Sequence, residues 1–156
     1  MCLAYDCECH VRISSKGDYG LRALFDLAQR FGQGPVQSEE IARRQGIPFN
    51  YLNQLLITMR RARLIESLRG PQGGHMLARP PGAITLLEIL TALEGPLLPD
   101  EPAREGLRPT VPEDLALVDE VWANLRAQIE QILAGMTLDD LCRRKRTRTE
   151  HMMYYI

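Results

Sequence analysis

The sequence lacks the features of a membrane protein, a secreted protein and an enzyme. No apolar run approaches the ~20 residues that a membrane span needs. No basic segment followed by an apolar one stands at the N-terminus, so we expect a cytoplasmic protein without membrane contact. The chain also has no nucleophile elbow, no phosphate-binding glycine loop with a lysine and no paired histidines at helical spacing. Because each of these motifs supports a common class of catalysis, we predict that the chain is not an enzyme.

Cysteine is scarce and lies near the two ends of the chain. Cys2, Cys7 and Cys9 fall within the first nine residues, and the fourth cysteine is Cys142. No CxxC pair is present, which excludes the ordinary zinc-ribbon spacing. Together with His10, the three N-terminal cysteines could form a soft-metal or redox site, or they could belong to an extension without function. Cys142 could form a disulfide between subunits or be a bystander. Both questions stay open at this stage.

Charge is strongly segregated along the chain, although its net charge is only −1. Residues 12–80 contain eleven Lys or Arg against five Asp or Glu, and residues 81–141 contain three against twelve. The last segment, 142–156, contains five basic residues and one acidic residue. A basic segment followed by an acidic one is typical of a phosphate-binding domain joined to a domain that does not bind nucleic acid.

Residues 14–62 have the pattern of three helices, the last two of which are separated by a tight turn. The serine pair at 14 and 15 can cap a first helix that runs to about Phe31. Ser38 can cap a second, short helix, which ends at Gly46. A third helix can begin at Pro48, because proline is tolerated in the first turn of a helix, and runs to about residue 62. This order predicts a helix-turn-helix.

A β-hairpin is predicted directly after the third helix. Residues 65–69 and 75–78 can form two strands around the turn GPQGG at 70–74. We therefore predict a mainly α protein: a winged helix-turn-helix with a two-stranded β-wing and a long C-terminal dimerisation helix. The expected domains are an N-terminal extension (1–11), a DNA-binding domain (12–80), a helical dimerisation region (81–141) with an acidic loop (96–112), and a basic tail (142–156).

A long amphipathic helix follows the predicted wing. Thr85 and Glu88 form a capping box for a fourth helix, and a loop rich in proline and acid leads to the long helix, which begins near Pro112. Its apolar residues recur at a/d spacing and predict either an internal core stripe or the interface of a homodimer. We favour the homodimer, because a small winged helix cannot cover this helix. The apolar positions are Leu115, Val118, Trp122, Leu125, Ile129 and Ile132.

The third helix and the hairpin supply the candidate DNA contacts. Asn and Gln can bind adenine edges with two hydrogen bonds, and an arginine on a wing can enter a narrow minor groove. The expected base contacts are Asn50, Tyr51, Asn53, Gln54 and Arg69. The expected phosphate contacts are Ser38, Arg43, Arg60, Arg61, Gln72, Gly73 and His75, with Arg44 and Arg63 as further candidates.

These motifs resemble the Rrf-type family of bacterial winged-helix regulators. The resemblance begins at residues 12–20 (RISSKGDYG), continues through 41–47 (IARRQGI) and 51–55 (YLNQL), and is strongest at 68–74 (LRGPQGG). The family includes the iron–sulfur cluster assembly regulator, the nitric-oxide-sensing repressor and the cysteine-metabolism repressor. The resemblance implies a dimer with crossed C-terminal helices, base contacts from Asn50 and Asn53, and insertion of Arg69 into the minor groove. The family often has an aromatic residue at the position of His75.

The resemblance also implies where a sensing site would lie. Members that bind an iron–sulfur cluster place three cysteines in the loop after the fourth helix, but residues 97–112 contain none here. Asp18 matches a carboxylate ligand in some members, yet one carboxylate without thiolates does not hold a cluster. We therefore expect no cofactor.

The sequence leaves more than one function open. The favoured prediction is a sequence-specific repressor that binds a palindromic operator in double-stranded DNA as a homodimer, with an unidentified effector or regulatory protein as a further partner. One alternative is a redox or metal sensor on DNA that uses Cys2, Cys7, Cys9 and His10. The other is a protein-interaction module that has lost DNA binding.

Overall fold

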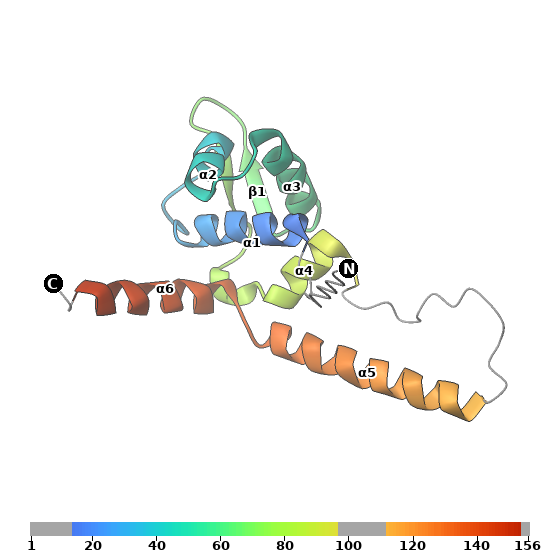
Figure 1. The fold of residues 1–156 in the computed structure, drawn as a ribbon. Coiled ribbons are helices and arrows are strands. Elements are labelled where there is room, and N and C mark those ends of the chain that lie inside the picture. Colours follow the sequence, from blue (N-terminus) through green and yellow to red (C-terminus); the bar gives the residue numbers. More distant parts are fainter. Residues whose placement is uncertain (1–13, 97–111, 154–156) are drawn as a thin grey trace, which may run out of the picture.

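The computed structural model describes residues 14–96 and 112–153, and these form a mainly helical fold with one β-hairpin (Figure 1). The predicted fold class is confirmed. The predicted N-terminal site (Cys2, Cys7, Cys9 and His10) lies outside the described residues. The elements are α1 (Ser15–Ala28), α2 (Ser38–Gln45), α3 (Phe49–Arg61), β1 (Ile65–Leu68), β2 (Gly74–Leu77), the 3-10 helix η1 (Pro81–Ala83), α4 (Leu86–Glu94), α5 (Pro112–Ala134) and α6 (Leu138–Met153).

Helix α1 lies at the centre of the fold. Figure 1 shows α2, α3 and the hairpin on one side of α1, and α4 and α6 on the other. Ser14 caps α1 as expected, since its hydroxyl accepts a hydrogen bond from the Lys16 amide at 3.1 Å. The helix ends at Ala28, three residues earlier than predicted, and Phe31 therefore lies beyond it and is exposed rather than part of its apolar face.

One hydrophobic core joins α1 to the helices on both of its sides. The predicted apolar stripe of α3 is confirmed, because Leu52, Leu55, Leu56 and Met59 are all buried. The core continues past residue 80, since α4 and α6 contribute to the same cluster. Its members from the second half of the chain are Ile84, Leu86, Ile89, Leu93, Leu138 and Cys142. The division of the chain at residue 80 remains a prediction about organisation, but the two parts share one core.

Helix α2 begins without the predicted serine cap. Gln37 is the N-cap residue and makes no capping hydrogen bond with its side chain, so Ser38 is the first helical residue. The backbone before Gln37 is fixed by the hairpin, because Val36 and His75 exchange amide-to-carbonyl hydrogen bonds of 2.9 and 2.8 Å. At its other end α2 stops at Gly46, whose φ of +62° is the left-handed conformation that glycine adopts most readily. The predicted turn of the helix-turn-helix is therefore present.

The predicted hairpin is present and antiparallel, and its second strand begins one residue earlier than predicted, at Gly74. Ile65 pairs with Leu77 and Leu68 with Gly74. Gly74 lies against the chain before α2, and a Cβ atom there would come within 2.5 Å of the Val36 carbonyl oxygen. Only glycine fits at this position, and the close approach places the hairpin beside the start of α2.

Helix α6 is longer than the sequence predicts. The basic run expected to be a tail is helical, and α6 continues to Met153. Thr137 and Asp140 cap the helix with reciprocal hydrogen bonds between 2.8 and 3.3 Å, and these lower the pKa of the Asp140 carboxyl. Leu138 and Cys142 pack into the core beside α1, so tertiary contacts stabilise a segment whose composition alone suggested a tail.

The burial of Cys142 bears on its predicted alternatives. Its side chain is only 8% exposed, and burial raises the pKa of its thiol. A buried thiol of this kind is unreactive, so the arrangement favours a bystander over a disulfide between subunits.

Helix α5 extends away from the rest of the fold (Figure 1). Near its C-terminal end, Leu133 and the following Met136 pack against the core, whereas most of the helix is exposed. Within residues 14–96 and 112–153, no helix is long and apolar enough to cross a membrane.

Candidate nucleic-acid interface

The amide-bearing side of α3 faces away from the core. Asn50 and Gln54 are exposed and Asn53 is half-buried, while the apolar stripe lies on the opposite side of the helix. Ile57 is one turn beyond Asn53 and is also exposed. Residues three and four apart share a helix face, so these four side chains form one surface strip, which we call the α3 strip (Asn50, Asn53, Gln54, Ile57).

Tyr51 lies at the edge of this strip, against α1. It is half-buried, and its ring meets that of Tyr19 edge to face at 5.8 Å between centroids. The guanidinium of Arg22 lies 5.4 Å from the centre of the Tyr19 ring. Tyr51 thus has a packing role that its sequence position did not reveal, and its predicted base contact remains a prediction.

The α3 strip and the hairpin share one surface hollow. Asn53, Ile57 and Arg60 of α3 line it together with Ser67 and His75 of the hairpin, and its volume is about 240 Å³. Within it, Ser67 Oγ and His75 Nδ1 form a hydrogen bond of 2.9 Å. Burial, and secondly the charge of Arg60, lower the pKa of His75. Helix α3 and the hairpin therefore form one continuous surface.

The turn of the hairpin places its predicted contacts at the surface. Arg69 and Gln72 are exposed and Gly73 is half-buried. A second hollow of about 310 Å³ lies between this turn and the start of α2, lined by Ser38 and Gly73 among others. Ser38, Gly73 and His75 are thus close to one another although they are up to 37 positions apart in the sequence.

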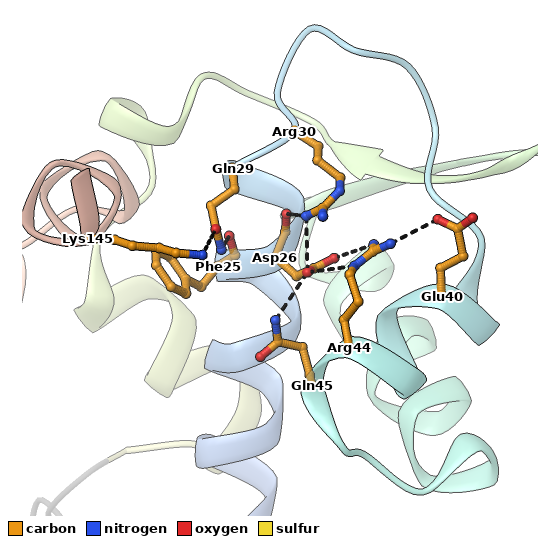
Figure 2. Close-up of polar contacts among 8 residues, drawn as sticks. All are labelled: Phe25, Asp26, Gln29, Arg30, Glu40, Arg44, Gln45 and Lys145. Atoms are coloured by element: carbon orange, nitrogen blue, oxygen red, sulfur yellow. Dashed lines mark hydrogen bonds and ion pairs between the residues drawn. The ribbon is translucent and has the colours of Figure 1, made fainter. Parts of the chain in front are cut away.

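The expected phosphate-binding cations divide into two groups. Arg43, Arg60, Arg61 and Arg63 are exposed, as a phosphate contact requires. Arg44 is different and contradicts the expectation, because its guanidinium points back into the fold (Figure 2). Its hydrogen bonds to Asp26 raise its pKa. Arg44 is therefore an internal ion-pair partner.

Sequence reasoning missed the carboxylate that binds Arg44. Asp26 is 1% exposed and accepts hydrogen bonds from Arg44 Nη2 and Nε at 2.7 and 3.0 Å. Arg30 Nη1 and Gln45 Nε2 each donate to its Oδ1 at 3.1 Å. We call these four residues the Asp26 cluster (Figure 2). The cluster fixes α2 to α1 and so sets the position of the helix-turn-helix.

Helix α5 exposes more apolar surface than its predicted seam contains. Val118, Trp122, Leu125 and Ile132 are exposed, while Leu115 and Ile129 are half-buried. Leu117 and Val121, which the a/d pattern omitted, are 63% and 64% exposed. Their spacing of four residues was the signal that would have found them. A contiguous apolar surface of this kind usually marks an interaction site.

The described residues do not fit an iron–sulfur cluster. Residues 14–96 and 112–153 contain no group of three His, Cys, Asp or Glu side chains placed to bind a metal. Cys142 is buried in the core. Asp18, which matches a ligand position, forms an i,i+4 ion pair with Arg22 at 3.1 Å. Since such clusters depend mainly on cysteine thiolates, the donor set in this part of the chain is insufficient.

Comparison with known proteins gives consistent matches over most of the chain. Residues 13–144 match the Rrf2 family model, described as an iron-dependent transcriptional regulator. The HTH-type transcriptional regulator CymR of Bacillus subtilis (strain 168) is 34% identical over 152 residues, which are 94% of this chain and 100% of the relative.

Solved structures give the same result. The structure of CymR (YrzC), the global cysteine regulator of B. subtilis, matches with a TM-score of 0.70 and 36% identity over 86% of this chain and 98% of that chain. The IscR structure from T. potens matches with a TM-score of 0.69 and 37% identity, covering 86% of this chain and 88% of that one.

Proposed function

The chain belongs to the Rrf2 family of HTH-type transcriptional regulators, and on that basis we propose that it represses transcription as a homodimer bound to an imperfect palindrome. It is a DNA-binding regulator related to CymR and IscR, and not an enzyme. Four parts of the proposal go beyond family membership: the repressor role, the homodimer, the palindrome and the residues that contact DNA.

The observation that supports DNA contact most directly is the shared surface of α3 and the hairpin. The α3 strip presents three amide side chains where a major groove can accept them, with Arg60 and Arg61 on the next turn for phosphates. Arg69 lies on the adjacent hairpin, where it can reach a minor groove. This arrangement favours a protein that contacts both grooves of one duplex.

The apolar side of α5 supports a homodimer. A two-fold arrangement would bury the exposed residues Val118, Trp122 and Leu125 against their copies. It would also place two recognition helices roughly 34–36 Å apart, or a multiple of this distance, which is the spacing of palindromic half-sites.

We further propose that DNA binding needs no bound cofactor. The family model is described as iron-dependent, but the predicted cluster loop has no cysteine and the described residues offer no alternative set of ligands. In this proposal, sensing by the N-terminal cysteines would act on a DNA-binding surface formed by α3 and the hairpin.

Selection of duplexes from a random DNA library, with and without reductant, tests the proposed function. We expect one enriched palindromic motif under both conditions, bound by the purified protein with a steep dependence on salt. Loss of enrichment without reductant would contradict the proposal that DNA binding needs no bound cofactor. If no duplex is bound at ~50 mM salt and roughly micromolar protein, the repressor proposal is wrong.

A further inference from the structure

A groove lies between α6 and the C-terminal end of α1, on the side of α1 away from the proposed DNA surface (Figure 1). Its volume is about 580 Å³, which is within the usual range of sites for small molecules. Its lining includes the buried residues Ala28 and Cys142 and the apolar residues Phe31 and Pro81. Lys145 and Arg146 of α6 also line it.

The cations in this groove are incompletely paired. Lys145 donates from Nζ to the Gln29 amide oxygen (Figure 2). Its Nζ lies 5.8 Å from the centre of the Phe25 ring. Both partners are neutral, and the described contacts of Lys145 include no carboxylate. Asp139 is shared, since it pairs with Arg143 and lies 4.0 Å from Arg146. Glu150 also lines the groove, one turn beyond Arg146.

The apolar wall has an uncovered aromatic ring. Phe31 follows the end of α1 by three residues and is 46% exposed. An exposed aromatic ring in the same groove as an ammonium group whose partners are neutral suits a molecule with an apolar body and one anionic end.

We propose that this groove binds a small organic carboxylate, with the carboxylate on Lys145 and the apolar body against Phe31. A bound carboxylate competes with Gln29 for the Lys145 ammonium. Gln29 follows directly on the last turn of α1, which also carries Asp26, and Asp26 binds Arg44 of α2 (Figure 2). The occupant can therefore change the position of the helix-turn-helix through one turn of helix. This regulatory half rests on the proposed DNA-binding function, whereas the binding half does not.

Titration calorimetry of the full chain without DNA tests the binding site. The probe is benzoate, with the neutral isostere benzamide as the matched ligand control. We expect saturable benzoate binding at about millimolar concentration, at least tenfold weaker binding of benzamide, and a similar loss in Lys145→Met. Arg144→Met, an exposed α6 neighbour outside the groove, should stay within about twofold of the wild type.

Three results would overturn the binding site. One is no saturation by benzoate, phenylacetate or hexanoate up to about 10 mM. Another is that benzoate and benzamide bind the wild type equally tightly, or that the wild type and Lys145→Met bind benzoate equally tightly. The third is a shift in sedimentation caused by Lys145→Met alone, which would mean that a second copy of the chain fills the groove.

The regulatory half is tested on the selected duplex. Saturating benzoate should change the DNA dissociation constant of the wild type at least threefold and leave that of Lys145→Met unchanged. Saturable benzoate binding with constant DNA affinity would overturn the coupling. If the wild type binds no duplex at all, the proposed function fails, while the calorimetric result still decides the site.

Discussion

Helices α3 and α5 are both amphipathic, but they expose opposite sides. The apolar stripe of α3 is buried in its own chain, and its polar side faces solvent. The apolar side of α5 is exposed over most of the helix. The first arrangement is a finished core that leaves a polar surface free to bind a polar partner. The second leaves apolar surface uncovered, for which a second copy is the proposed cover. Mutations on the α3 side should therefore affect folding or DNA binding, and mutations on α5 should affect association.

The largest effect is expected from breaking the internal contacts on the α3 side. Asp26→Ala leaves the Arg44 side chain, which is 25% exposed, without its main partner. Removal of one member of a buried ion pair typically costs about 3–5 kcal/mol, and we expect a loss of this size in the free energy of unfolding measured with urea. Glu40→Ala is the control, because it removes only the exposed partner of Arg44 and should cost about 0–1 kcal/mol. Equal losses would contradict the structural role of the Asp26 cluster.

The next effect belongs to α5 and should appear in association rather than folding. Trp122→Asp introduces a charge into the proposed interface, and truncation of a central interface aromatic typically costs at least 2 kcal/mol. We expect the dimer dissociation constant from analytical ultracentrifugation to rise about a hundredfold, with little change in helical content.

Ala123→Asp is the matched control for that experiment, because Ala123 is exposed on the opposite side of α5. It should leave association within about threefold of the wild type. If both variants associate equally well, the apolar side of α5 is not the interface, and the contrast between the two helices is lost.

A smaller effect is expected on the polar surface beside α3. Arg69→Ala should weaken specific DNA binding by about 1–3 kcal/mol, because it removes the proposed minor-groove contact, and should leave unfolding unchanged. Fluorescence anisotropy on the selected duplex measures the change. Arg148→Ala on α6 is the control, since it removes a similar exposed charge far from the hairpin. Equal losses from the two variants would mean that Arg69 acts only through net charge.

The contrast between these regions also explains what the sequence could predict. The buried stripe of α3 and the hairpin turn follow from local spacing and turn residues, and both are present. The Asp26 cluster joins residues 18 and 19 positions apart, and Tyr51 packs on Tyr19 from another helix. Such contacts depend on tertiary packing. Only an acid between the apolar residues Leu24 and Leu27 hinted at the cluster.

The C-terminal segment was mispredicted for the same reason. The charges of residues 143–148 suggested a tail, because no apolar period runs through them. Helix α6 forms nonetheless, since Leu138 and Cys142 at its start pack into the core and the Thr137–Asp140 cap begins it. Two core positions in its first turns can extend a helix beyond its own amphipathic pattern, which local composition does not reveal.

The smallest expected effect is a pH dependence located where α3 meets the hairpin. Burial and Arg60 lower the pKa of His75 in the folded chain, so the unfolded chain takes up a proton more readily. The free energy of unfolding therefore keeps its full value above the ordinary histidine pKa of about 6.5 and decreases as the pH falls below it. The free energy of unfolding is measured with urea at about pH 7.5 and at about pH 5.5. The decrease between the two pH values should be larger for the wild type than for His75→Phe. The Phe ring keeps the packing of the hollow and removes the titration, so an identical acid loss in both proteins would place the titrating group elsewhere.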